Sequence, residues 1–239
     1  MLSALVVGSV APDFRYFLNL APRSHFGHSF KGIFIVCLPV GLAVLWVFQQ
    51  IMKLPLISLA PNSHQQRLVP LAKPFRWGGV RRFGLIVASL LLGGILHLVW
   101  DAFTHDNGLV VRNVPDMRIP LEEFGTHRPL YNVLQHGSTL LGLALLVFWY
   151  WRWFKRTPPQ PVPLYLQMSA RAKRWIAGSI LALSASLAAV YAYFYSYHIS
   201  SFGLFVGAFV VVCMSLLYIL ALGFSLWWHR MDSHSATSH

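Results

Sequence analysis

The residues whose types and spacing could do chemistry concentrate in the stretch GGILHLVWDAFTHDNG, at 93–108. His97 and Asp101 are four positions apart, so a helix would place them on one face, about 6 Å from each other. An imidazole and a carboxylate at that separation can bind one divalent ion. His105 lies eight residues beyond His97, about 12 Å along a helix. It would serve a second ion, a substrate hydrogen bond or no ligand at all.

Further candidate ligands precede the first long apolar run. Asp13 lies in the segment APDFR, and His25 and His28 lie in RSHFGHS. An ionisable side chain in the bilayer interior costs at least ~2.5 kcal/mol, so such residues usually serve a purpose. Nitrogen and oxygen ligands together suit zinc, manganese or iron. We therefore predict a divalent metal, zinc first and manganese or iron as alternatives, bound by Asp13, His28, His97 and Asp101, with His25 in reserve.

Histidines and arginines near these ligands are candidates for catalysis and substrate binding. His105 and His136 would act as general acid or base, because histidine titrates near neutral pH. Arg23 and Arg128 would bind a phosphate group, with Arg112 and Arg118 as further candidates. Two structural interpretations stay open. His97 and Asp101 could be a charge-neutral pair that stabilises helix packing, and the arginines could be loop residues that meet lipid headgroups.

Elements that span a bilayer must position these residues. The chain has 239 residues, of which 56% are hydrophobic and 11% charged, whereas soluble domains carry about 25% charged residues. The sequence predicts an all-α, polytopic membrane protein with about five transmembrane helices, preceded at 2–20 by a short or re-entrant helix interrupted by APDFR. The predicted spans are 30–52, 83–105, 133–153, 175–197 and 203–228.

The loops predict orientation and organisation. With five spans, 53–82, 154–174 and the C-terminal tail share a side that, with the flanking Arg152, holds 13 of the 19 Lys and Arg. The positive-inside rule places that side in the cytoplasm, so the candidate ligands face outward. We predict a membrane domain at 1–153 that carries the site and a proline-rich, basic connector at 154–174. A structural helix pair at 175–228 and a disordered tail at 229–239 follow.

Four segments within 2–150 carry a family resemblance: ALVVGSVAPDFRYF, RSHFGHSFKGIF, HLVWDAFTHDNG and RPLYNVLQHGSTLLG. They resemble an uncharacterised bacterial membrane family, domain of unknown function 4184. More distantly, the chain is similar to bacterial inner-membrane proteins called metal-dependent hydrolases, which carry Pro-Asp, H-x-x-x-H-S and H-x-x-x-D elements in that order. This resemblance matches Asp13, His28, His97 and Asp101 to those elements. Here HFGHS is one residue shorter than the family spacing, and Arg15 stands where an acid is expected.

Two functions from different classes follow. The first is a membrane-embedded metal-dependent hydrolase of the bacterial inner membrane, acting at its outward face on a lipid or lipid-linked ester or phosphoester. Its partners would be membrane lipids and the lipid-linked substrate, and no nucleic-acid motif accompanies the basic residues. The second is a non-enzymatic carrier or assembly factor that uses the His and Asp residues as a proton relay or structural network. A structural metal would require four protein ligands.

Overall fold

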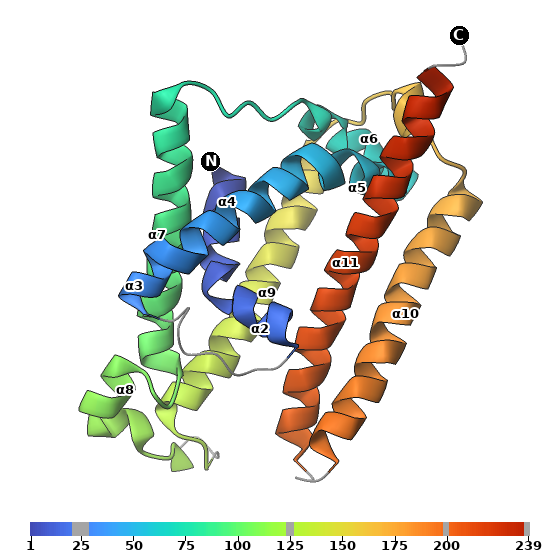
Figure 1. Cartoon of the computed structure of the whole chain (residues 1–239). Coiled ribbons are helices and arrows are strands. Elements are labelled where there is room, and N and C mark those ends of the chain that lie inside the picture. Colours follow the sequence, from blue (N-terminus) through green and yellow to red (C-terminus); the bar gives the residue numbers. More distant parts are fainter. Residues whose placement is uncertain (21–28, 123–126, 198–200, 237–239) are drawn as a thin grey trace.

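The computed structural model describes residues 1–20, 29–122, 127–197 and 201–236, and these residues fold into helices without a strand (Figure 1). This confirms the predicted all-α class. Five helical stretches are long and apolar enough to cross a membrane, as expected of a multi-pass membrane protein. They are Phe30–Leu59, Val80–Asn113, Leu130–Arg156, Ala170–Ser196 and Phe202–Met231.

The first long stretch is a helix whose turns widen twice. It consists of α3 (Phe30–Gly32), α4 (Leu38–Val47) and α5 (Lys53–Leu59), joined by the π-helical segments η2 (Ile33–Cys37) and η3 (Phe48–Met52). Pro39 and Pro55 each follow one π segment by two or three residues. Proline lacks the N–H for an intrahelical hydrogen bond, and its ring clashes with the carbonyl four residues earlier. Wider turns accommodate both prolines, and the helix continues seven residues beyond the predicted end at 52.

The N-terminal segment is a short helix, as predicted. α1 (Leu2–Val10) has nine residues and is therefore about 14 Å long, less than half of a bilayer core of about 30 Å. A 3-10 turn, η1 (Ala11–Asp13), leads into α2 (Phe14–Asn19), which ends at Leu20 in the left-handed conformation. α1 packs against α7 (Val80–Thr104) and α4. Ala4, Leu45, Ile86 and Leu90 form the buried core between these helices.

The remaining helices run up and down beside this core (Figure 1). The loop after α7 contains α8 (Leu109–Asn113) and η5 (Pro115–Arg118), and it lies at the end of the molecule where α9 (Leu130–Arg156) begins. α6 (Asn62–Leu68) with η4 (Val69–Ala72), the start of α10 (Ala170–Ser196) and the end of α11 (Phe202–Ala236) lie at the opposite end. The segments that the sequence assigns to one side of the membrane, 53–82, 154–174 and the end of the chain, therefore lie at one end of the molecule.

The connector and the C-terminus differ from the predicted bounds. The connector is shorter than 154–174, since α9 ends at Arg156 and α10 begins at Ala170. Its 3-10 turn, η7 (Leu164–Leu166), buries Leu166 against Ile57, Phe224 and Trp228. A disordered tail was predicted from residue 229, whereas α11 continues to Ala236. Packing explains the added turns at 229–231: Trp228 is buried, and His229 Nε2 lies 2.9 Å from the carbonyl oxygen of Ile51.

Candidate functional site

The site begins where α1 and α7 cross with almost no space between their main chains. A Cβ on Gly8 would lie 2.2 Å from the carbonyl oxygen of Leu90, and a Cβ on Gly93 would lie 2.4 Å from that of Leu5. Real atoms cannot approach so closely, so only glycine permits this crossing. It brings the end of α1 beside the last turns of α7, which carry the predicted ligands.

His97 is the centre of the cluster. Its Nδ1 lies 2.7 Å from the carbonyl oxygen of Ser9. A carbonyl oxygen can only accept, so Nδ1 carries a hydrogen. The opposite ring atom, Nε2, lies 3.0 Å from Asp101 Oδ2 and 3.7 Å from Asp13 Oδ1. The side chains of His97, Asp101 and Asp13 are 16%, 18% and 30% exposed. One mostly buried imidazole nitrogen therefore faces two carboxylates from different helices.

His105 joins this cluster because it follows Asp101 by four residues, the spacing that places two side chains on one face of a helix. α7 ends at Thr104, and His105 has extended backbone with φ −114° and ψ 143°. Its Nδ1 lies 3.3 Å from Asp101 Oδ1, on the carboxylate whose other oxygen contacts His97. Thr104 Oγ1 also lies 3.3 Å from His105 Nδ1. The side chain of His105 is 52% exposed, so it connects the buried part of the cluster to the outside.

Tyr16 is a member of the site that the sequence reasoning missed. It follows Asp13 by three residues, at the spacing that places two side chains on one helical face. Burial and the negative charges of Asp13 and Asp101 raise the pKa of Tyr16 to about 12. The phenol therefore keeps its proton at physiological pH and can donate a hydrogen bond. The segment APDFRYF contains this signal, but an aromatic residue near a membrane surface is also an ordinary interfacial anchor.

The other predicted residues fall outside the cluster or outside the described residues. His25, His28 and Arg23 lie in 21–28, which the structure does not describe. His136 is exposed on α9, and Arg128 donates from Nη1 to Asn132 Oδ1 at 3.0 Å just before that helix.

Two charged residues of the loop after α7 form an ion pair with each other. Arg118, a further candidate for phosphate binding, pairs with Asp106 at 3.2 Å and also donates to the main-chain oxygen of Asp106. This pairing ties the start of the loop to η5. Arg118 therefore has a structural role here that the sequence did not indicate.

The described side chains of this cluster are of types that bind metal ions, but they are not arranged around a common point that an ion could occupy. One imidazole nitrogen and two carboxylates are ligands that zinc, manganese and iron accept. Among the residues that the structure describes, however, no group of three or more His, Cys, Asp or Glu is arranged to hold an ion. The side chains lie at hydrogen-bonding and ion-pairing distances instead. In this conformation they form an acid–imidazole network.

Comparison with known proteins identifies the family of this chain. Residues 1–226 match the family described as Domain of unknown function (DUF4184). The chain belongs to this family. No curated protein and no solved structure matches it. The match confirms the resemblance to DUF4184 noted in the sequence and extends it from 2–150 to residue 226, within the fifth span. Because its description states no activity, a function for this member must be argued from the cluster itself.

Proposed function

We propose that this protein is a membrane-embedded, metal-dependent hydrolase that binds a divalent ion between Asp13, His97 and Asp101. The observation that carries the proposal is the environment of His97 Nε2. Nδ1 is committed to the Ser9 carbonyl, and Nε2 faces two carboxylates at 3.0 and 3.7 Å. The charge of these mostly buried carboxylates needs compensation, which a proton shared within the cluster or a metal ion can supply. Metal-binding histidines commonly donate their other N–H to a carbonyl in this way.

The residues of the cluster would have different roles in the reaction. When bound, zinc, or manganese or iron as alternatives, supplies a Lewis acid that polarises an ester and helps water to ionise. Asp101 would hold the ion through one oxygen, while its other oxygen contacts and positions His105. His105 reaches the exposed side of the cluster, where it can take a proton from water and return it to a leaving group. His136 is the alternative acid or base, and Tyr16 donates a hydrogen bond.

The substrate class follows from where the cluster lies. Asp101 and His105 end a membrane-spanning helix, so lateral access from the bilayer and access from water meet there. We propose a lipid or lipid-linked ester or phosphoester as substrate, in the bacterial inner membrane at the outward face. Arg128, and Arg23 in the segment outside the described residues, would bind its phosphate. His28, with His25 in reserve, would complete the ligand set.

A proton relay is the second candidate function, and a different observation favours it. Asp13, His97, Asp101 and His105 form an unbroken chain with contacts of 3.7, 3.0 and 3.3 Å. Such a chain can pass a proton without any metal, as acidic and histidine residues do in membrane carriers. In that case the protein would be a non-enzymatic carrier or assembly factor.

Hydrolysis assays separate the two functions. The purified protein in detergent would be incubated with bis-p-nitrophenyl phosphate, phosphatidylglycerol or an undecaprenyl-linked phosphoester, after loading with zinc, manganese or iron. The hydrolase proposal predicts turnover that needs the ion and that falls about 10²–10⁴-fold in His105→Ala, the usual contribution of a general acid or base. His127→Ala, which removes an exposed histidine near Glu122, is the matched control and should keep full activity. Turnover that survives complete metal removal would contradict the proposal.

A further inference from the structure

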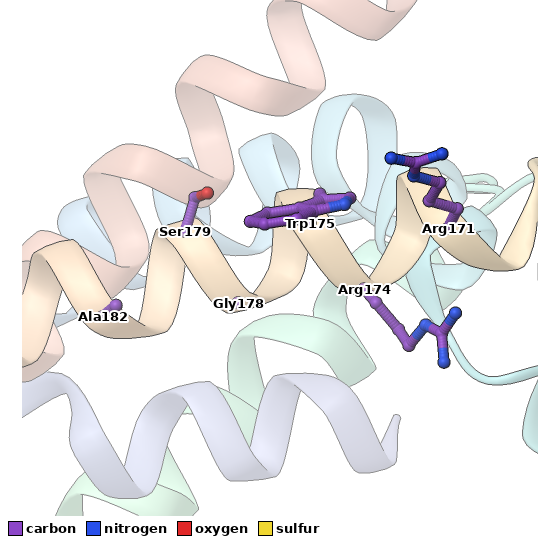
Figure 2. Close-up of a pocket in the computed structure, with 6 residues that line it drawn as sticks. All are labelled: Arg171, Arg174, Trp175, Gly178, Ser179 and Ala182. Carbon is purple, nitrogen blue, oxygen red and sulfur yellow. The ribbon is translucent and has the colours of Figure 1, made fainter.

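A second feature lies at the opposite end of the molecule from the cluster. A groove of about 590 Å³ runs along the first half of α10 and is lined by Arg171, Arg174, Trp175, Gly178, Ser179 and Ala182. Figure 2 shows the two arginine side chains at one end of this row, Trp175 beside them, and the small residues further along the helix. The groove therefore has a cationic head and a narrow floor of small residues.

The two arginines have no hydrogen-bonding or ion-pairing partner among the residues that the structure describes, and both side chains are exposed. Lys173, on the same turn, is the contrast: it is buried, and its Nζ donates to Ala60 O, Asn62 Oδ1 and Gln65 Oε1. Residues 124–239 contain a single acid, Asp232. The protein thus offers Arg171 and Arg174 almost no anion of its own.

The position of the groove along α10 indicates which kind of ligand could bind there. α10 begins at Ala170, so the arginines lie in its first two turns, at the end of a helix long and apolar enough to cross a membrane. Trp175 is 68% exposed, and tryptophan is enriched at the headgroup level of membranes. Gly178 and Ala182 lie about 10 and 16 Å beyond Arg171 along the helix axis. A headgroup and an acyl chain match this order of charge, aromatic ring and small residues.

We propose that this groove is a binding site for an anionic phospholipid. Arg171 and Arg174 bind the phosphate of the headgroup, the indole of Trp175 lies at the glycerol level, and an acyl chain packs along Gly178, Ser179 and Ala182. Basic pockets on membrane helices bind acidic headgroups by the same physics. The site is independent of the His–Asp cluster and would stabilise the α10–α11 pair within the bilayer.

Native mass spectrometry of the full chain in detergent tests this site. Wild-type protein is titrated with phosphatidylglycerol and, separately, with zwitterionic phosphatidylcholine. We expect preferential binding of phosphatidylglycerol, and about 30-fold weaker binding in the double variant Arg171→Gln, Arg174→Gln, from the attraction that each arginine gains near anionic lipid. The matched control is the double variant Arg152→Gln, Arg156→Gln. It removes two exposed arginines from the C-terminal end of α9, at the same end of the molecule as the groove, and it should bind lipid like wild type.

A variant without a charge change tests the floor of the groove. A Cβ on Gly178 would meet no atom within 4 Å, so Gly178→Leu should fold normally while filling the space for the acyl chain. It should weaken lipid binding about fourfold for each acyl methylene that it displaces. Equal affinity for the two lipids, or wild-type affinity in the Arg171, Arg174 variant, would overturn the proposal. Displacement of the lipid by millimolar inorganic phosphate would assign the site to free phosphate instead.

Discussion

Gly8 and Gly93 face each other where α1 crosses α7, and the ideal Cβ of Gly93 would lie only 2.8 Å from the carbonyl carbon of Gly8. This contact fixes the end of α1 against α7 just before His97. Because Ser9 follows Gly8 directly, the same contact places the Ser9 carbonyl 2.7 Å from His97 Nδ1. The helix crossing and the orientation of the imidazole are thus one structural feature.

Gly93→Ala should separate α1 from α7 and misorient His97. A methyl group there cannot fit without moving main-chain atoms, and overpacking of this kind costs about 1–3 kcal/mol. The thermal unfolding midpoint in detergent should fall, and metal affinity should fall with it. Gly84→Ala on the same helix is the control, since its Cβ would meet nothing within 4 Å. Equal midpoints for the two variants would contradict the tight crossing.

Lys173→Met should destabilise the contact between α10 and α6. The variant keeps much of the side-chain volume but leaves the acceptors on Ala60, Asn62 and Gln65 without their buried donor. Unsatisfied buried polar groups cost about 1–3 kcal/mol, so the unfolding midpoint should drop. Arg156→Met, at the exposed end of α9, should leave the midpoint unchanged. A loss of stability as large in Arg156→Met would show that Lys173 has no special role.

Tyr16 should ionise only at very high pH. Its pKa is raised to about 12 by burial and by Asp13 and Asp101, compared with about 10 in an unfolded chain. The protonated form is favoured by the fold, so this contribution to stability is complete below pH 10 and is lost as the pH rises through 12. The tyrosinate absorbance of wild type minus that of Tyr16→Phe should show this late titration. A difference curve centred near pH 10 would contradict it.

His105→Ala should impair catalysis without emptying the proposed metal site. His105 contacts Asp101 Oδ1, whereas the proposed ligands converge on His97 Nε2 and Asp101 Oδ2. We therefore expect near-normal zinc affinity and strongly reduced hydrolysis. Isothermal titration with zinc and a turnover assay on the same preparation measure both. A variant that loses zinc and activity together would make His105 a ligand instead.

Much of the fold could be predicted because bilayer-spanning helices follow from apolar length. The crossing of α1 and α7 could not, because a glycine in an apolar run does not reveal which main chain it approaches. The end of the first span was missed, because π-helical turns let the helix pass Pro55 and continue from the predicted residue 52 to Leu59.

The candidate site was predicted where spacing on one helix decides it. His97 and Asp101 share a face of α7, as four-residue spacing requires. His105 follows Asp101 by the same four-residue spacing, and its contact is with Asp101. Tyr16 was missed because an aromatic residue near a membrane surface is also an ordinary interfacial anchor, and the Ser9 carbonyl has no side-chain pattern that marks it. Asp13 lies beside His97 although 84 positions separate them in the chain, so local spacing could not predict this contact.

The metal content of the purified protein tests the central claim most directly. Elemental analysis of wild type, His97→Ala, Asp101→Ala and the control His127→Ala would follow incubation with zinc, manganese or iron and removal of excess ion. A site between Asp13, His97 and Asp101 predicts near-stoichiometric metal in wild type and control, and loss of that metal in both cluster variants. Wild-type protein that retains none of the three ions, or cluster variants that retain them fully, would contradict the claim and leave the proton relay as the function of these residues.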